Sequence, residues 1–163
     1  MRTLALALAG AATATVVGAQ RGAPTPRLVV FVTVDQLIPD YFTRYGAEFT
    51  GGLRRLMTDG TLYVNAFHDH ATTETAPGHA TVLSGRFPRS TNIVRNNVGV
   101  PDRDSPLVGG GGTGASPYRF KGTALADWMR AADPATRILS ISRKDRGAIL
   151  PVGRTKDAGV FWY

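Results

Sequence analysis

Residues 28–35 form a nearly unbroken run of β-branched and aromatic side chains, Leu-Val-Val-Phe-Val-Thr-Val-Asp. A strand with one face in water alternates apolar and polar residues, whereas a strand covered on both faces does not. The run therefore predicts a buried strand of a parallel sheet. Asp35 ends this run, and ligands gather at the carboxyl edge of such sheets. Asp35 is a candidate metal ligand, with an aspartate that caps the following turn as the equal alternative.

Helix and strand patterns alternate along the rest of the chain. In chain order, the expected elements are a helix over residues 39–45, a helix ending at Asp59-Gly60, a strand over 61–67, a helix capped by Thr123 and ended by Asp133-Pro134, a strand over 137–142, and a strand starting at Gly159. This order predicts an α/β fold with a mostly parallel sheet flanked by helices. The last predicted strand is still in progress at Tyr163, so we expect the fold to be incomplete in this chain.

One further helix is predicted beside a candidate nucleophile. In Ala71–Gly85, Pro77 suits the first helical turn, because its missing N–H would be unpaired there, and Gly85 suits the end. Thr75 then lies at the helix start or one residue before it, where free N–H groups and the helix dipole favour an anion. The dipole is worth only about 0.3–1 kcal/mol, so a nucleophilic Thr75 also needs a bound cation. The commoner alternative is that Thr75 is simply an N-cap.

Lys144 and Arg146 stand two residues apart just after the predicted strand 137–142. Such a basic pair is able to converge on a phosphate, although a solvated turn is the usual interpretation. The triplet His68-Asp69-His70 is interpreted as loop surface, because successive residues of an extended chain point to opposite faces. His79, four residues after Thr75, is expected to support helix packing rather than to bind metal.

The chain also carries features of export. Met1–Ala19 has one basic residue, an apolar run and a small-residue pattern near Ala19, which predicts a signal peptide over residues 1–19, followed by a linker over residues 20–27. We expect an exported protein, periplasmic or secreted, without stable membrane insertion after signal cleavage. The chain has no cysteine, so any metal must be held by Asp, Glu, His or a hydroxyl.

Two further patterns argue against nucleotide and nucleic-acid binding. The formal charge is +7, but the basic residues are scattered without a basic run, which favours a solvated surface over a nucleic-acid partner. The glycine run 109–112 has no strand before it and no Lys-Ser or Lys-Thr after it, so it is interpreted as a surface loop rather than a phosphate-binding P-loop.

Four segments together resemble the alkaline phosphatase superfamily. They are Val-Thr-Val-Asp-Gln at 32–36, Gly-Gly-Leu-Arg-Arg-Leu at 51–56, Thr-Ala-Pro-Gly-His-Ala-Thr at 75–81 and Ser-Arg-Lys-Asp-Arg-Gly-Ala-Ile-Leu-Pro at 142–151. They occur in the family's order. Within the superfamily the chain is similar to bacterial periplasmic phosphatases that use threonine, which are close to the nucleotide pyrophosphatase/phosphodiesterases.

The resemblance implies a role for each candidate residue. Asp35 takes the position of a zinc-ligating aspartate, and Thr75 that of the nucleophile, which also coordinates zinc. Asn96, with Asn97 as the alternative register, matches an asparagine that donates to a phosphoryl oxygen. Lys144 and Arg146 match a Lys-x-Arg pair that contacts phosphate in the monoesterase branch and that the diesterase relatives generally lack.

The implied function is a zinc-dependent phosphate monoester hydrolase that acts on a small-molecule phosphate ester through a phosphothreonine intermediate. A phosphodiesterase or nucleotide pyrophosphatase is the alternative within catalysis. The family site holds two zinc ions, and its further Asp and His ligands are absent, since the only acidic residue after Arg146 is Asp157 and no histidine follows His79. Residues 28–163 therefore resemble the N-terminal part of the catalytic domain, and a non-catalytic fragment or binding module is the second alternative. The sequence does not indicate an oligomeric state.

Overall fold

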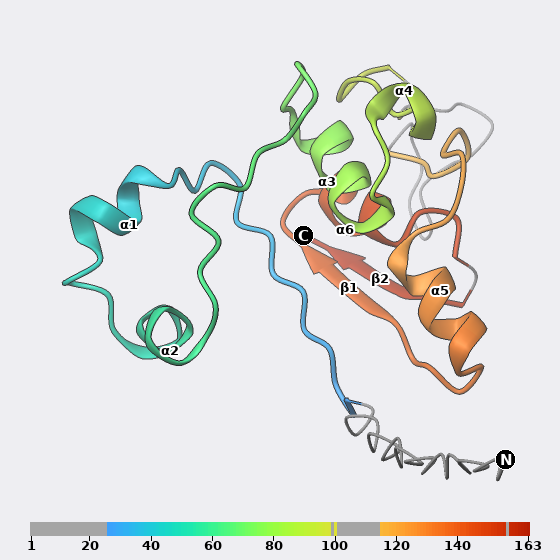
Figure 1. Cartoon of the computed structure of the whole chain (residues 1–163). Helices are drawn as coiled ribbons and strands as arrows, with labels where there is room; N and C mark the ends of the chain where they lie inside the picture. Colours follow the sequence, from blue (N-terminus) through green and yellow to red (C-terminus); the bar gives the residue numbers. More distant parts are fainter. Residues whose placement is uncertain (1–25, 99, 101–114, 156) are drawn as a thin grey trace, which may run out of the picture. The chain divides into compact units, whose positions relative to one another are not determined.

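The computed structural model describes residues 26–98, 100, 115–155 and 157–163 (Figure 1). The predicted signal peptide, most of the predicted linker and the glycine run 109–112 lie outside these residues. Contacts divide the chain into two units, Met1–Val32 and Thr33–Tyr163. The second unit contains every described helix and strand.

The first two helices confirm the sequence patterns that predicted them. α1 spans Asp40–Tyr45, and α2 spans Gly51–Asp59. The second helix ends where its glycine was expected, because the N–H of Gly60 donates to the carbonyl oxygen of Leu56. Neither helix contains a buried residue.

The helix beside the candidate nucleophile is α3, which spans Thr75–Ser84. Thr75 is its first residue, and Glu74 takes the N-cap position. Gly85 closes the helix in the left-handed conformation, with φ at 62°, and its N–H donates to the carbonyl oxygen of Thr81. A residue with a Cβ atom is strained at such a positive φ, so glycine is the residue that suits this position. A short helix not expected from the sequence, α4 at Pro88–Thr91, follows α3 and packs against it.

The predicted helix after residue 123 is also present, but its cap was predicted wrongly. α5 spans Leu125–Ala132, and its N-cap is Ala124. Thr123 does not cap it, because the Asp127 carboxylate accepts the Ala124 N–H at 2.8 Å. The Thr123 hydroxyl instead accepts a hydrogen bond from the indole N–H of Trp128.

A parallel strand pair confirms the α/β class. β1 spans Leu139–Ser142 and β2 spans Gly159–Trp162, with Leu139 opposite Gly159. The connection between them contains α6 at Asp145–Ile149 and a 3₁₀ turn, η1, at Leu150–Val152. α6 packs against both strands, and α3 packs against α6 and η1 (Figure 1).

The core lies where α3, α6 and η1 meet. Its buried residues are Ala76, Ala80, Ile93, Val100, Ala115, Phe120, Ile149 and Leu150, and the partly buried Val160 and Trp162 pack against them. The small residues of α3 let its backbone approach η1 closely. The consequence is that α3, which begins at Thr75, is fixed against η1 and α6, the helix that follows β1.

Two predicted strands, 28–35 and 61–67, are not formed, and those predictions were wrong. Both segments are irregular, and Leu28 and Phe67 are 77% and 83% exposed. A strand exists only through hydrogen bonds to a neighbour, and within the described residues neither segment has a strand beside it. An unbroken apolar run therefore indicates residues that suit a sheet, but it does not show that a partner strand is present.

Among the described residues, no helix is both long and apolar enough to cross a membrane.

Candidate active site

The Thr75 hydroxyl lies at the start of α3, where the first N–H groups of the helix have no partner within it. No side chain caps this end from the N-cap position itself, so Thr75 is not the N-cap that the simpler interpretation proposed. The side chain of Thr75 is partly exposed. A hydroxyl here is accessible and lies at the positive end of a ten-residue helix.

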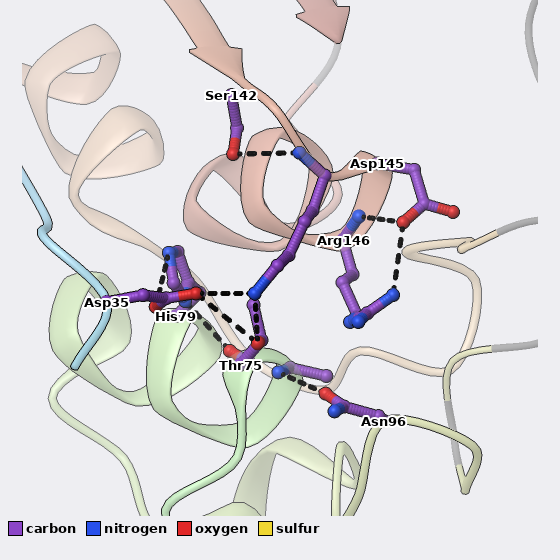
Figure 2. A network of polar contacts seen from close by, with 9 residues as sticks. Asp35, Thr75, His79, Asn96, Ser142, Asp145 and Arg146 are labelled. Atoms are coloured by element: carbon purple, nitrogen blue, oxygen red, sulfur yellow. Dashed lines mark hydrogen bonds and ion pairs between the residues drawn. The ribbon is translucent and has the colours of Figure 1, made fainter. Parts of the chain in front are cut away.

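Two charged side chains from distant parts of the chain reach this hydroxyl (Figure 2). Thr75 Oγ1 is 3.5 Å from Asp35 Oδ2 and 3.4 Å from Lys144 Nζ. The same carboxylate oxygen accepts a hydrogen bond from Lys144 Nζ at 2.9 Å. The three side chains thus form a triangle of a hydroxyl, a carboxylate and an ammonium group.

The local backbone explains how Lys144 reaches the hydroxyl. β1 ends at Ser142, and Lys144 is the N-cap of α6 in an extended conformation. The N–H of Lys144 donates to Ser142 Oγ at 3.2 Å, which fixes the turn between strand and helix. Asp35 follows the irregular segment 28–34 and belongs to neither strand of the pair.

The ammonium group of Lys144 lowers the pKa of Asp35 below its ordinary value, mainly through their hydrogen bond. Partial burial of Asp35 acts in the opposite direction, and the charges of His79 and Lys144 and the Thr75 hydrogen bond lower the pKa further. The carboxylate is therefore ionised at neutral pH and available to attract a cation.

His79 contacts the backbone of the first turn of α3. Its Nδ1 lies 2.8 Å from the carbonyl oxygen of Thr75, and a carbonyl only accepts, so Nδ1 carries the proton. Its Nε2 then faces Asp35 Oδ1 at 3.9 Å. The ring is buried, at 8% exposure. This arrangement holds the backbone of Thr75 and agrees with a packing role.

Asn96 lies against the other side of the same turn. Its Oδ1 accepts the N–H of Ala76 at 2.8 Å, and its own backbone N–H donates to Glu74 Oε2 at 2.7 Å. Asn97, the alternative register, is exposed. Asn96, rather than Asn97, is the asparagine in contact with the start of α3.

Arg146 does not join the triangle directly. Its Nη1 lies 3.6 Å from Asp145 Oδ1, and the other oxygen of Asp145 accepts the N–H of Ala115 at 3.2 Å. The Nε of Arg146 is buried and has no hydrogen-bond partner among the described residues. Figure 2 shows the guanidinium on the same side of the Thr75 helix as Asn96.

The donor set fits a divalent cation in part. Asp35 and Thr75 present a carboxylate and a hydroxyl oxygen within 3.5 Å of each other, and hard or borderline cations accept such ligands. A tetrahedral zinc site needs more than two ligands. In the part of the chain that the structure describes, no group of three or more His, Cys, Asp or Glu side chains is arranged to hold a metal. In the triplet at residues 68–70, His68 and Asp69 are exposed and His70 is partly buried.

The hydrogen bond between Glu74 and Asn96 was not predicted from the sequence. An acidic residue just before a helix is commonly a cap or a favourable charge for the helix dipole, and neither pattern indicates a partner 22 residues away. The pairing of Asp145 with Ala115, 30 residues apart, was likewise invisible in the sequence.

A family model for type I phosphodiesterases / nucleotide pyrophosphatases matches residues 29–162. The chain belongs to this family. The match covers all the elements described above, from the segment before Asp35 to β2. The resemblance to the alkaline phosphatase superfamily that the sequence motifs indicated is thereby confirmed.

Two of the curated relatives are named as bacterial alkaline phosphatases. Alkaline phosphatase PhoK of a Sphingomonas species is 38% identical over 86% of this chain and 27% of its own length. Alkaline phosphatase PhoD of Zymomonas mobilis is 35% identical over 83% of this chain and 26% of its own length. The chain therefore spans about a quarter of the length of these relatives.

A solved structure has the same fold. It is a variant of alkaline phosphatase PafA in which a threonine, an asparagine, a lysine and an arginine are replaced. The similarity has a TM-score of 0.72 at 26% sequence identity, and it covers 80% of this chain and 28% of that chain. The α/β architecture of this family member is therefore that of an alkaline phosphatase, present in part.

Proposed function

We propose that this chain provides the nucleophile and the phosphate-binding side chains of a zinc-dependent phosphate monoester hydrolase. The observation that carries the proposal is the convergence of Asp35 Oδ2 and Lys144 Nζ on Thr75 Oγ1, at 3.5 and 3.4 Å. The three residues are far apart in the sequence, and they meet at a helix N-terminus that favours anions. A hydroxyl with a carboxylate and a cation beside it suits covalent phosphoryl transfer, because a hydroxyl nucleophile is activated by a neighbouring base or positive charge.

The residue types agree with the relatives. The four residue types replaced in the PafA variant occur here in the same order, as Thr75, Asn96, Lys144 and Arg146. The separation of threonine from asparagine is the same in both proteins, and so is that of lysine from arginine. This correspondence supports the assignment of Thr75 as nucleophile and of the other three residues to the phosphoryl group.

The chemistry follows from the positions of these side chains. The oxygen of Thr75 attacks phosphorus and releases its proton to solvent, the P–O bond to the alcohol breaks, and the leaving oxygen takes up a proton from solvent, which gives a phosphothreonine and the free alcohol. Water then attacks the phosphothreonine, releasing inorganic phosphate and restoring the hydroxyl. The N–H groups of α3 and the ammonium of Lys144 stabilise the developing negative charge. Asn96 and Arg146 bind the other phosphoryl oxygens.

Zinc is the cofactor of this proposal, with Asp35 and Thr75 as two of its ligands. When bound, it supplies positive charge that lowers the pKa of the Thr75 hydroxyl, which neither the helix dipole nor one ammonium group achieves alone. Asp35, whose pKa is already lowered, is ionised to receive it. The family site takes two zinc ions, and the remaining ligands are not among the described residues.

The expected substrate is a small-molecule phosphate ester, and the expected location is outside the cytoplasm, as the signal peptide pattern over residues 1–19 implies. A phosphodiesterase or nucleotide pyrophosphatase is the second candidate, favoured by the description of the family model. A monoester dianion carries one more charged oxygen than a diester, and Lys144 and Arg146 suit that charge. The ratio of kcat/KM for an aryl phosphate to that for a bis-aryl phosphate separates the two candidates.

A third candidate is a non-catalytic fragment or binding module, favoured by the incomplete ligand set and by the share of the relatives that the chain spans. Zinc analysis together with turnover of an aryl phosphate by the 163-residue chain decides this question. Stoichiometric binding of two zinc ions with sustained turnover excludes the third candidate.

The test of the nucleophile is Thr75→Ala, assayed with zinc in the 163-residue chain and in the longest polypeptide that its gene encodes. We expect the loss of nearly all aryl phosphate turnover, because no other hydroxyl occupies the triangle. Thr73→Ala is the matched control, since Thr73 is an exposed threonine on the same approach to α3 and should retain the parental rate. Parental turnover in Thr75→Ala removes this residue from the mechanism.

A further inference from the structure

Two hydrogen bonds bracket the candidate nucleophile. Glu74 and Ala76, the residues before and after Thr75, both bind Asn96: the Glu74 carboxylate accepts the backbone N–H of Asn96 at 2.7 Å, and the N–H of Ala76 donates to Asn96 Oδ1 at 2.8 Å. The bonds join segments 22 and 20 residues apart. We name this pair of hydrogen bonds the Glu74–Asn96 clamp. It resembles a capping box whose two halves lie on separate segments.

The clamp determines which way the Asn96 amide faces. A backbone N–H only donates, so the Asn96 atom beside Ala76 must be the oxygen. The Nδ2 group is then on the other side of the amide, turned away from the Ala76 N–H. An inverted amide would place two donors against each other, so the orientation is set by chemistry as well as by geometry.

Within the described residues, the hydrogen bond to Asn96 is the interaction that explains the position of the Glu74 carboxylate. As the N-cap of α3, it makes no side-chain bond to its own helix. Its carboxylate instead reaches the turn at residues 95–98, where Arg95 and Val98 form an isolated bridge. A hydrogen bond from a backbone N–H to a carboxylate is about twice as strong as a neutral one. The carboxylate therefore fixes the backbone of Asn96 to the residue next to the nucleophile.

We propose that Glu74 is a positioning residue, which holds the Asn96 side chain at a set distance from Thr75 so that its Nδ2 meets a phosphoryl oxygen. This inference rests on the proposed function of Thr75 and Asn96. A donor displaced by about 0.5–1 Å loses much of its effect on a transition state, so the anchor of Asn96 matters as much as Asn96 itself. Glu74 acts through Asn96 and does not touch the substrate.

The first experiment measures the clamp without catalysis. In ¹H–¹⁵N NMR spectra of the 163-residue chain, Glu74→Ala should shift the Asn96 backbone N–H strongly upfield, because a hydrogen bond to a carboxylate deshields the proton. Glu74→Gln retains an acceptor and should keep most of the wild-type shift. The matched control is Glu48→Ala, an exposed glutamate between α1 and α2. An unchanged Asn96 resonance in Glu74→Ala overturns the proposal.

The second experiment uses inorganic phosphate as the probe. We expect the Asn96 side-chain NH₂ resonances of the wild type to move on addition of phosphate. Glu74→Ala should need about tenfold more phosphate for the same change, in the range of losses found when a positioning partner is removed. Glu74→Gln should lie within about threefold of the wild type. Equal phosphate affinity in Glu74→Ala and the wild type contradicts a positioning role.

The third experiment is a double-mutant cycle on aryl phosphate kcat/KM. If Glu74 acts through Asn96, the variant Glu74→Ala/Asn96→Ala is no slower than Asn96→Ala alone, whereas independent roles give losses that multiply. Multiplied losses overturn the proposal. The proposed function fails separately: parental turnover in Thr75→Ala, with the NMR shift of Asn96 still dependent on Glu74, refutes the nucleophile and leaves the clamp intact.

Discussion

The Thr75 hydroxyl has a positive and a negative side chain within 3.5 Å, and the two charges also bind each other. The ion pair between Lys144 and Asp35 is partly exposed, with side chains 45% and 38% accessible. Exposed pairs stabilise proteins by only about 0.2–1 kcal/mol. The Lys144–Asp35 ion pair therefore acts mainly on the protonation of Asp35 and on the positions of both side chains beside Thr75. Its effect on the stability of the fold is small.

We predict that Lys144→Met raises the pKa of Asp35 toward its ordinary value, because the hydrogen bond from Lys144 is the largest cause of the lowered pKa. A lowered pKa stabilises the folded state at pH values above the ordinary pKa of 3.8, and this stabilisation is lost as the pH falls through the folded pKa. Wild type should thus exceed Lys144→Met in unfolding free energy by under about 1 kcal/mol at pH 7, and the difference should shrink in acid.

The measurements are a carboxyl ¹³C NMR titration and urea unfolding at pH 7 and pH 3, both in a chelating buffer. Lys121→Met is the control, because it removes an exposed ammonium group elsewhere. An Asp35 titration midpoint that is identical in wild type and Lys144→Met means that the ion pair is not populated in solution.

At the scale of the element, α3 depends on a glycine at its end and tolerates a side chain within it. We predict that Gly85→Ala lowers the unfolding free energy by about 1–2 kcal/mol, because Gly85 has φ at 62° and open space around it, so only the backbone conformation is penalised. Gly78→Ala, in the same helix and also in open space, should raise the unfolding free energy by up to about 1 kcal/mol.

Urea unfolding followed by circular dichroism measures both variants of this pair. The opposite signs are the informative result. If both substitutions destabilise the chain equally, the left-handed closure of α3 is not what makes Gly85 necessary.

The helices were largely predictable from sequence because their signals are local. Pro77 and Gly85 lie within the helix or next to it, and the apolar spacing of Leu53, Leu56 and Met57 requires no distant partner. The strand predicted over 137–142 is present as β1 at Leu139–Ser142, and it has the partner strand β2 beside it. Segments 28–35 and 61–67 were predicted as strands from composition alone, and a strand also requires a neighbour.

The sequence predicted which residues form the candidate site, but it did not predict all the contacts between them. The motifs placed Asp35, Thr75 and Lys144 on different segments, and the expectation that Asp35 and Lys144 end strands of one sheet located both near one edge. Asp35 does not end a strand in the structure, yet it meets Lys144 at 2.9 Å. The pairing of Glu74 with Asn96 left no sequence signal, because either residue alone has a common local explanation.

At the scale of the whole molecule, the strand pair has an apolar face in solvent. Leu139, Ile141 and Phe161 are 66%, 65% and 59% exposed, and Ile141 lies opposite Phe161 in the register. On the buried side, Ser140 Oγ donates to the carbonyl oxygen of Ala148. Contiguous exposed apolar surface of this kind binds hydrophobic dyes and promotes association.

We predict that the 163-residue chain binds anilinonaphthalene sulfonate and associates at high concentration, and that Leu139→Lys reduces both. The matched control is Leu56→Lys, a leucine of similar exposure, 68%, on α2. Dye fluorescence and sedimentation velocity measure the two effects. A reduction of the same size in both variants would mean that the strand face has no special part in association.

The contact between Lys144 and Asp35 joins residues 109 positions apart. Closing a flexible loop of that length costs roughly 4 kcal/mol in chain entropy, several times the worth of an exposed ion pair. The pair is therefore too weak to bring its two segments together by itself, and it forms because packing of the chain around it has already closed the loop. The two charges beside the Thr75 hydroxyl consequently depend on the packing of α3 against α6 and η1, which positions Thr75 and Lys144.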